Sequence, residues 1–336
     1  MADASIMRAS HAWIAAYAVT GALQPLLVDR LKQQGLAPAR LLGPMMANLI
    51  GMTLVAPARE ACVGSPAPIA QTVRASWRPL AAAAALDFGS AALLCVGLLY
   101  AGAAAFTLVY ASCAPLVSAI GAAAGAQIRR EQWLAIALAT LGLALYELAC
   151  KSEGKAAADA RLWGSLLAFL GSVGHSGMFV MAEHALENKS AKAAGLTPFR
   201  SSCMGAAETM VLATYVALQV TDYDAERMSN VAVAYAPLIL IDSLHALSFF
   251  ATLGERGAVS AAMLKGVQVV FVFVASSVLS CDQESGAGCA TPAKAAGVAI
   301  VVAGLALFYA KEPPRLRGAS ASGDDGEELL LPSTVT

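Results

Sequence analysis

Long apolar blocks, nearly free of charged residues, follow one another along almost the whole of this 336-residue chain. In the block at 79–101, Asp87 is the one charged residue. The length of these blocks matches the ~20 residues that a helix needs to cross a bilayer. Only 13% of the residues are charged, against about 25% in a soluble domain. We therefore expect an all-α polytopic membrane protein.

Ten membrane-spanning helices are expected, because backbone groups inside hydrocarbon find no water and must bond within a helix. The predicted spans lie near 11–28, 40–58, 79–101, 103–126, 131–149, 161–183, 198–220, 231–252, 258–280 and 291–310. The segment 59–78 is rich in Pro, Ser and Arg, which predicts a solvated loop. Lys and Arg are more frequent in the connections on the side of the N-terminus, which favours a cytosolic location for both chain ends.

An internal repeat divides the chain. Three pairs of stretches match in order, namely GPMMANLIG at 43–51 with TPFRSSCMG at 197–205, LDFGSAALLCVGLLYAGA at 86–103 with IDSLHALSFFATLGERGA at 241–258, and GLALY at 142–146 with GLALF at 304–308. Their offsets are 154, 155 and 162 residues. Because each copy holds five spans, an odd number, the second copy is expected to be inverted, an architecture that recurs in transporters.

The expected organisation follows from this repeat. It comprises a cytosolic N-terminus at 1–10, a first five-helix repeat at 11–149, a linker loop at 150–160, a second five-helix repeat at 161–310 and a disordered cytosolic tail at 311–336. The tail is predicted to be disordered because it is rich in Pro, Ser and acidic residues. Asp87 and Asp242 occupy equivalent positions in the two repeats.

Four stretches resemble the drug/metabolite transporter superfamily, namely LDFGSAALLCVGLLYAGAAAF, REQWLAIALATLGLALY, LWGSLLAFLGSVGHSGMFVMAEHAL and GAVSAAMLKGVQVVFVFVASS. Within it the chain looks most like the nucleotide-sugar-transporter-like solute carrier 35 family, in particular its F branch and the chloroquine-resistance-transporter-like proteins. The sequence departs from the family pattern at Ala135, where a Gly is usual, and at Ser165, where an Asp is usual. The resemblance implies solute transport and leaves the substrate open.

Ionisable residues within spans are expected to face a cavity or a partner. Asp87 and Asp242 could bind a substrate ammonium group or carry protons, or they could pin neighbouring helices. Lys265 could hold a substrate carboxylate or phosphate, or it could pair internally with Asp242 or Glu208. The tyrosines at 100 and 110 are expected to be packing or interfacial residues.

Four further residues are candidates for substrate binding or proton coupling. Glu208 is a membrane carboxylate, and Gln268 shares a helical face with Lys265. His175 and His245 ionise near neutral pH. His245 follows Asp242 by three residues, so the two could form a pair; a satisfied core histidine is the commoner case.

Two features outside the spans suggest processing and sorting. Cys281 and Cys289 flank a short polar loop, and they are a disulfide candidate if that loop faces a lumen. In the tail, DGEELL fits an acidic dileucine sorting pattern through Asp325, Leu329 and Leu330. We therefore expect an endomembrane location (Golgi, lysosome or vacuole) rather than the plasma membrane, with sorting adaptors as candidate partners.

The leading hypothesis is a secondary transporter of a small organic solute that works by alternating access, with proton coupling or exchange left open. The alternative is a transport-inactive scaffold or receptor with the same fold. An enzyme is not expected, because the chain has no HExxH, Ser/His or phosphate-binding pattern. No metal or other cofactor is expected. The net charge of −1 offers no basic field for nucleic acid, and a homodimer is left open.

Overall fold

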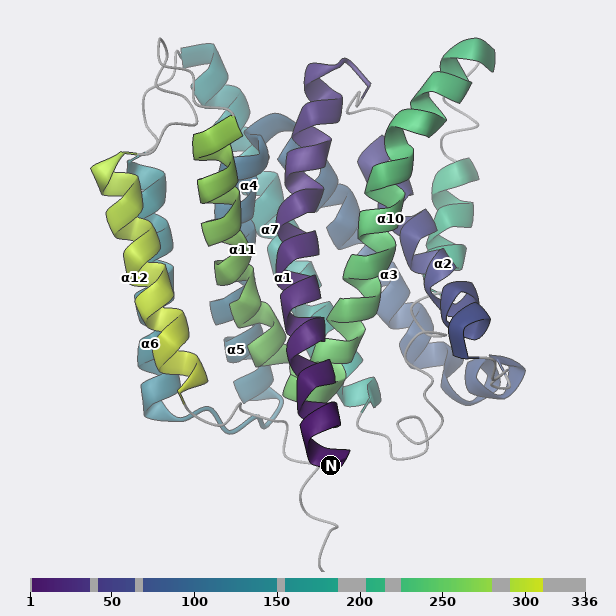
Figure 1. Ribbon diagram of the computed structural model, residues 1–336, viewed down its shortest axis with the longest axis horizontal. Coiled ribbons are helices and arrows are strands. Elements are labelled where there is room, and N and C mark those ends of the chain that lie inside the picture. Colours follow the sequence, from purple (N-terminus) through teal and green to yellow (C-terminus); the bar gives the residue numbers. More distant parts are fainter. Residues whose placement is uncertain are drawn as a thin grey trace, which may run out of the picture.

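The computed structural model describes residues 2–36, 42–63, 69–149, 155–186, 204–214, 225–279 and 291–310. Nearly all of this part is helical, and it contains no strand. The elements are α1 (Ala2–Gln33), α2 (Gly43–Val63), α3 (Ile69–Ala101), α4 (Ala103–Tyr110), α5 (Cys113–Ala123), α6 (Arg130–Leu148), α7 (Lys155–Leu186), α10 (Ala225–Arg256), α11 (Ala258–Leu279) and α12 (Pro292–Tyr309). A further helical segment lies at 204–214. Figure 1 shows most of them running side by side.

Seven helices of the described part are long and apolar enough to cross a bilayer. They lie at His11–Gln33, Ala81–Ala101, Ala105–Ala123, Asp159–Glu183, Val233–Arg256, Ala258–Ala275 and Pro292–Tyr309. A shorter apolar helix lies at Gly43–Val55. These helices agree with an integral, multi-pass, all-α membrane protein. The predicted number of ten spans stays a prediction.

The predicted loop at 59–78 is wrong for most of its length. α2 continues to Val63 and α3 begins at Ile69, so the described residues of this segment are helical. The described residues of this segment contain no Pro or Gly, and residues of good helix propensity such as Ala, Arg, Glu and Gln make up more than half of them. The prolines that suggested a loop lie at 66 and 68, outside the described residues.

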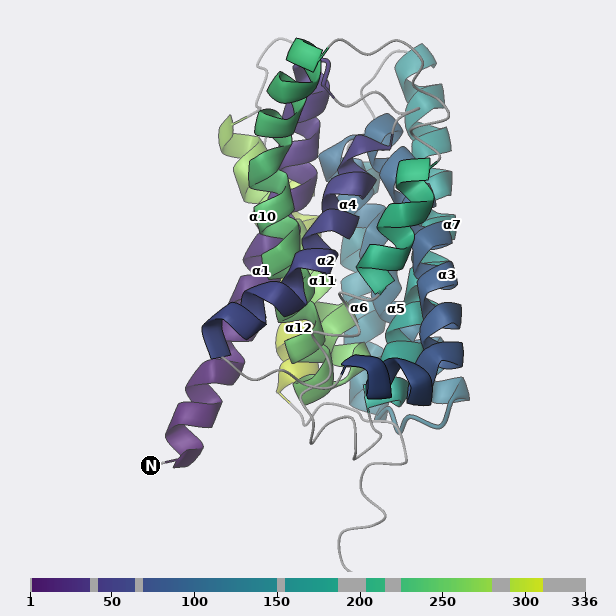
Figure 2. The same cartoon turned by 90° about the vertical axis from the view of Figure 1, so that its right-hand side faces the viewer.

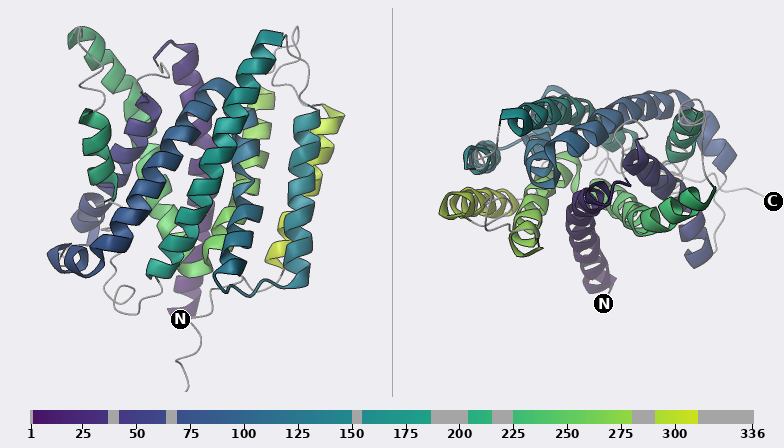
Figure 3. Two further views of the ribbon diagram at one scale, coloured as in Figure 1. Left: turned by 180° about the vertical axis from the view of Figure 1, so that it is seen from behind. Right: turned by 90° about the horizontal axis from the view of Figure 1, so that it is seen from above.

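The helices pack in pairs, most extensively α3 with α7 and α6 with α12. Seen from behind, α3 and α7 run beside each other, and α6 and α12 form the edge of the bundle (Figure 3). Glycines allow the second pair to approach closely. A Cβ added to Gly142 would lie 2.7 Å from the carbonyl oxygen of Gly297. Small residues at such contacts favour helix association, because packing rather than hydrophobicity joins helices in lipid.

α1 and α2 pack against α10 on the opposite side of the bundle. In Figure 2, the N-terminal end of α1 extends away from the other helices. Contacts of Thr20 with His245 and of Gln24 with Asp242 fix α1 and α10 as antiparallel, since the residue numbers rise along one helix and fall along the other.

Two helix breaks lie at Gly102 and Gly257, which separate α3 from α4 and α10 from α11. Their φ angles are 78° and 83°, in the region that L-residues with a side chain rarely adopt. A third break separates α4 from α5. Pro115 has no N–H to bond the carbonyl of Ala111, and its ring excludes that carbonyl from a regular helix. The N–H of Ala114 bonds the Ala111 carbonyl instead, at 3.1 Å.

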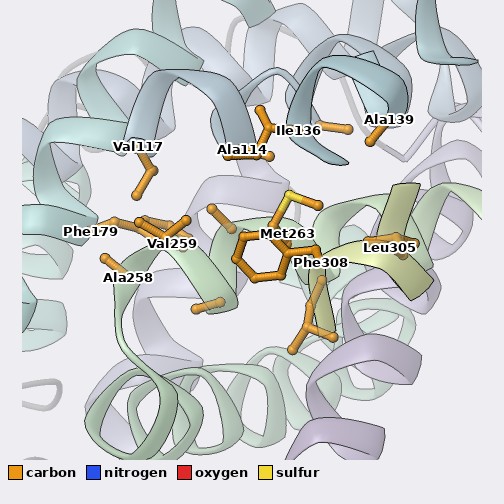
Figure 4. Close-up of a cluster of buried hydrophobic side chains, with 14 of the residues drawn as sticks. Ala114, Val117, Ile136, Ala139, Phe179, Ala258, Val259, Met263, Leu305 and Phe308 are labelled. Atoms are coloured by element: carbon orange, nitrogen blue, oxygen red, sulfur yellow. The ribbon is translucent and has the colours of Figure 1, made fainter. Parts of the chain in front are cut away.

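Buried apolar side chains form two clusters. The α11 cluster surrounds α11 and includes Phe179, Val259, Met263 and Phe308 (Figure 4). The α2 cluster lies between α2, α3 and α10 and includes Leu49, Met52, Leu98 and Leu238. Every helix of the described part contributes side chains to at least one of the two clusters. Polar side chains lie where the two clusters meet.

Candidate functional site: a polar cavity between the helices

A cavity of about 160 Å³ lies inside the bundle. Side chains from α1, α2, α3, α4, α7, α10 and α11 line it. Its apolar lining comes from both clusters, for example Phe249 from the α11 cluster and Leu98 from the α2 cluster. A mostly apolar cavity with a few convergent polar groups is the usual form of a small-molecule site.

The cavity brings together six of the seven residues that we predicted for substrate binding or proton coupling. These are Asp87, Asp242, Lys265, His175, His245 and Gln268. They come from four helices and are spread over 182 positions of the sequence. The seventh, Glu208, is buried on the segment 204–214 but does not line the cavity.

Asp87 of α3 forms an ion-pair contact with His175 of α7. His175 Nδ1 lies 3.1 Å from Asp87 Oδ1. The His175 ring also contacts Tyr110 and Phe179, with ring centroids 5.6 and 5.1 Å away. An aspartate, a histidine and a tyrosine at one wall of a cavity are groups that can exchange protons with a bound solute.

Asp242 and His245, which share a helical face and could have paired, contact other residues instead. Asp242 Oδ1 accepts a hydrogen bond from Gln24 Nε2, and His245 Nδ1 lies 3.0 Å from the Thr20 hydroxyl. Both partners belong to α1, which packs against this face of α10 and offers polar side chains to it. Asp242 Oδ2 has no hydrogen-bond partner in the described part of the chain.

Lys265 lies between two aromatic rings. Its Nζ is 4.4 Å from the centroid of Tyr110 and 5.1 Å from that of Tyr17. Such cation–π contacts are worth about 2 kcal/mol or more when water is excluded. Within the described residues Lys265 forms no ion pair with Asp242 or Glu208, so the internal-pair alternative is wrong. The Lys265 side chain is therefore not neutralised by either of these carboxylates.

Gln268 is one helical turn beyond Lys265 and is almost fully buried. Its Nε2 donates a hydrogen bond to the backbone carbonyl of Tyr17 at 3.1 Å. Gly21 leaves the space for this side chain, since a Cβ there would collide with the Gln268 amide. Gln268 thus joins α11 to α1 at the cavity wall.

The lining residues that sequence reasoning missed include Tyr17 and Gln24 of α1 and Tyr110 of α4, and Thr20 of α1 contacts the lining residue His245. Tyr17, Thr20 and Gln24 share one face of α1, at the spacing of a helical stripe. This polar stripe in a membrane span was a signal that could have identified them. Tyr110, which we expected to be a packing or interfacial residue, instead lines the cavity and contacts Lys265. The internal repeat could have identified it, because Tyr110 lies 155 positions before Lys265, the same offset that separates Asp87 from Asp242. Tyr100 is half exposed.

Aromatic rings close the cavity towards the α11 cluster. Phe249 contacts Phe179 and Phe250, with ring centroids 4.7 and 5.0 Å apart. In the other direction along α1, the lining continues to Val28 and, on α3, to Leu98. The polar residues therefore lie between a packed aromatic end and an end lined by aliphatic side chains.

Carboxylates lie at the N-termini of α4 and α11. Both helices contribute residues to the cavity lining. Glu183 Oε2 accepts a hydrogen bond of 2.8 Å from the N–H of Ala258, the first residue of α11. Asp29 lies near the start of α4, since a Cβ added to Gly102 would lie 3.9 Å from Asp29 Oδ1. A carboxylate satisfies a free N–H at a helix start and is favoured there by the helix dipole.

Comparisons with known proteins inform the fold alone. No protein-family model matches the sequence, and no curated protein matches it. A solved structure, described only as a crystal structure of a protein, superposes with a TM-score of 0.52 at 18% sequence identity. The superposition covers 87% of this chain and 98% of that one. This fold therefore occurs in another protein of nearly the same extent.

The remaining predicted features lie elsewhere. Cys281, Cys289, Asp325, Leu329 and Leu330 fall outside the described residues. In the described ranges, no group of three or more His, Cys, Asp or Glu side chains could hold a metal ion.

Proposed function

We propose that this protein is a secondary transporter that binds a small organic solute in the cavity and exposes it to one side of the membrane at a time. The observation that carries this proposal is the charge inside the cavity. Lys265 and Asp242 are buried within apolar helices; Asp242 Oδ2 has no hydrogen-bond partner in the described part of the chain, and Lys265 Nζ lies over the rings of Tyr17 and Tyr110. Charged residues in spans are costly unless they meet a partner, and a solute would be that partner.

We also propose that the chain belongs to the drug/metabolite transporter superfamily and resembles the solute carrier 35 family within it, with ten spans in two inverted repeats. Equivalent residues support the repeat. The helix breaks at Gly102 and Gly257 are 155 positions apart, and the carboxylates near them, Asp29 and Glu183, are 154 apart. Each repeat would thus have a carboxylate near the start of a helix that begins directly after a glycine.

Helix contacts support the same arrangement. In an inverted repeat of this kind α1 corresponds to α7 and α3 corresponds to α10. The contact of α3 with α7 then has its counterpart in the contact of α1 with α10, and both are among the most extensive in the bundle. An architecture of this type has its solute site between the repeats, near the middle of the membrane.

Alternating access would use equivalent positions at the two ends of the cavity. Leu94 and Leu98 of α3 are 155 positions before Phe249 and Leu253 of α10. All four side chains are buried, the α3 residues in the α2 cluster and the α10 residues in the α11 cluster, and Leu94, Leu98 and Phe249 line the cavity. Alternating access would separate the contacts at one of these ends while it tightens those at the other.

The charges favour a zwitterionic, cationic or neutral solute. The lining holds two carboxylates, one lysine and two histidines. A solute with a carboxylate and an amino group could place the first at Lys265 and the second at Asp242. A nucleotide sugar carries several negative charges and would need more basic groups than this lining provides.

The endomembrane location is part of the proposal, as are sorting adaptors that recognise the tail. They depend on the acidic dileucine pattern around Asp325. Two leucines beside negative charges offer an adaptor both apolar and ionic contacts.

A solute-uptake screen in proteoliposomes tests the transport function. Purified full-length protein would be assayed with radiolabelled amino acids, amines and nucleotide sugars, with and without a pH gradient. Saturable uptake that Lys265→Met lowers and Lys32→Met leaves unchanged is the expected result, because Lys32 is exposed at the end of α1. Solute binding without any uptake would favour the alternative, a receptor with this fold.

A further inference from the structure

Two opposite charges line the cavity from different helices. Asp242 of α10 is 3% exposed, and its Oδ2 has no hydrogen-bond partner in the described part of the chain. Lys265 of α11 is equally buried, and its Nζ lies over the rings of Tyr17 and Tyr110. Buried polar groups nearly always have a hydrogen-bond partner, so Asp242 Oδ2 lacks the donor that such an atom normally meets.

The distance between these two charges follows first from α1, which contacts both residues. The Tyr17 ring lies beside Lys265 Nζ, and Gln24 donates a hydrogen bond to Asp242 Oδ1. Tyr17 and Gln24 are seven residues apart, which is about 10 Å along a helix that rises 1.5 Å per residue. Both side chains lean towards the N-terminus of α1, so the lean does not shorten this spacing.

α10 gives a consistent spacing. The Tyr17 ring stacks on His245 and contacts Phe249, with ring centroids 4.7 and 5.7 Å away. These two residues follow Asp242 by three and seven positions, which is about 5 and 10 Å along the helix. The ring beside Lys265 therefore lies well beyond Asp242 along α10.

α11 holds Lys265 at the far end of this interval. After the break that follows α10, α11 turns back and runs in the same direction as α1 (Figure 1). Its Gln268 bonds the backbone carbonyl of Tyr17, and Lys265 precedes Gln268 by one helical turn. The Lys265 side chain thus extends alongside the Tyr17 ring and not towards Asp242.

A solute that bridges charges about 10 Å apart needs its own charges well separated. A charged hydrogen bond takes up about 2.8 Å at each end, which leaves about 4 Å or more between the carboxylate oxygen and the ammonium nitrogen of the solute. In an α-amino acid these atoms are only about 3 Å apart, because both groups share one carbon atom. Three methylenes between the two groups extend this distance to about 5 Å.

The remaining lining agrees with a small zwitterion. Asp87 already contacts His175, and His245 contacts the Thr20 hydroxyl, so Asp242 and Lys265 are the charges left for a solute. The cavity volume of about 160 Å³ is close to the roughly 150 Å³ of a cavity that binds benzene. The site therefore matches a solute of benzene-like size with one ammonium and one carboxylate group.

We propose that the solute is a small zwitterion whose ammonium and carboxylate groups are separated by about three methylenes, as in 4-aminobutyrate, and not an α-amino acid. Its ammonium group donates a hydrogen bond to Asp242 Oδ2, and its carboxylate accepts one from Lys265 Nζ. The methylenes lie against the apolar lining between the two charges, which includes Ala246 of α10. This inference rests on the proposed function of the site and names its substrate class.

Two isomers test the charge separation. 4-Aminobutyrate and L-2-aminobutyrate have the same atoms and charges and differ in the distance between the charged groups. Each is titrated into full-length protein in phosphatidylcholine nanodiscs, and binding is measured from the rise in the thermal unfolding midpoint. 4-Aminobutyrate should bind at least tenfold more tightly, because it alone reaches both charges and a hydrogen bond to a charged group is worth about tenfold or more. Equal binding, tighter binding of L-2-aminobutyrate, or no binding of either overturns the proposal.

Substitutions test which end of the solute meets which charge. Asp242→Asn keeps an acceptor for Gln24 and should weaken 4-aminobutyrate binding at least tenfold, but should not weaken binding of butyrate, which has no ammonium group. Lys265→Met should weaken 4-aminobutyrate and spare butylamine, so one variant suffices if the other does not fold. Glu131→Gln is the control and should change neither, because Glu131 is exposed on the first turn of α6. Equal losses for 4-aminobutyrate and its one-charge analogue overturn the assignment.

Binding and uptake together separate this inference from the transport function. Saturable uptake of another solute by a protein that binds neither isomer would overturn the substrate class and leave transport standing. Selective binding of 4-aminobutyrate without its uptake would support the substrate class and favour a receptor over a transporter.

Discussion

Lys265 and Tyr110 meet inside the bundle, with the ammonium nitrogen 4.4 Å from the ring centroid. They are 155 residues apart, the same offset that separates Asp87 from Asp242. If the chain is an inverted repeat, these two residues occupy equivalent positions and meet near its axis. One position thus provides a cation and the other an aromatic ring that stabilises the cation when no solute is bound.

Lys265→Met should weaken solute uptake at least tenfold, while the protein remains folded. A hydrogen bond to a charged group contributes about 1.5–3 kcal/mol, and every 1.4 kcal/mol is tenfold in affinity. Uptake kinetics in proteoliposomes would show the loss in the apparent affinity. Uptake unchanged by this substitution would mean that the solute does not contact Lys265.

Asp87→Asn should leave folding intact and depress transport. The amide is isosteric and can still accept a hydrogen bond from His175, so the α3–α7 contact survives, but it no longer carries a charge. Monodisperse elution in detergent, together with reduced uptake, is the expected result. If Asp87→Asn abolished expression instead, Asp87 would be a structural residue that joins α3 to α7.

Cys95 should react with small thiol reagents, whereas Cys113 should not. Both are free and buried, but only Cys95 lines the cavity. The measurement uses two variants that each retain one of these cysteines and have serine at the other six positions. Mass spectrometry after labelling in membranes would detect the adduct. Equal labelling of the two variants would contradict the cavity boundary described above.

Gly297→Ala should destabilise the protein, whereas Gly254→Ala should not. The Cβ at 297 would lie 2.8 Å from the carbonyl oxygen of Gly142, and the Cβ at 254 would meet nothing within 4 Å. Overpacking of this kind typically costs 1–3 kcal/mol. Both substitutions give the same gain in helix propensity, about 1 kcal/mol, so their difference isolates the contact. Thermal unfolding in detergent measures it, and equal midpoints would exclude close packing of α6 against α12.

Much of the site was predictable because the bilayer restricts what a sequence can do. Helical structure followed from the apolar blocks, since no other arrangement satisfies their backbone groups. Asp87, Asp242 and Lys265 were recognisable as cavity residues because charge inside a span needs a polar environment. The same reasoning failed at 59–78, where α2 and α3 extend beyond their apolar segments and the pattern of the blocks no longer applies.

The partners of these residues depended on the tertiary structure. Asp242 and His245 are three positions apart and could have paired, but α1 lies against them and supplies Gln24 and Thr20 instead. Periodicity identifies the residues that share a helix face, whereas the neighbouring helix determines which atoms meet there. The sequence by itself thus determined that charge is buried in helices, and packing alone decided that Lys265 contacts rings while Asp87 contacts a histidine.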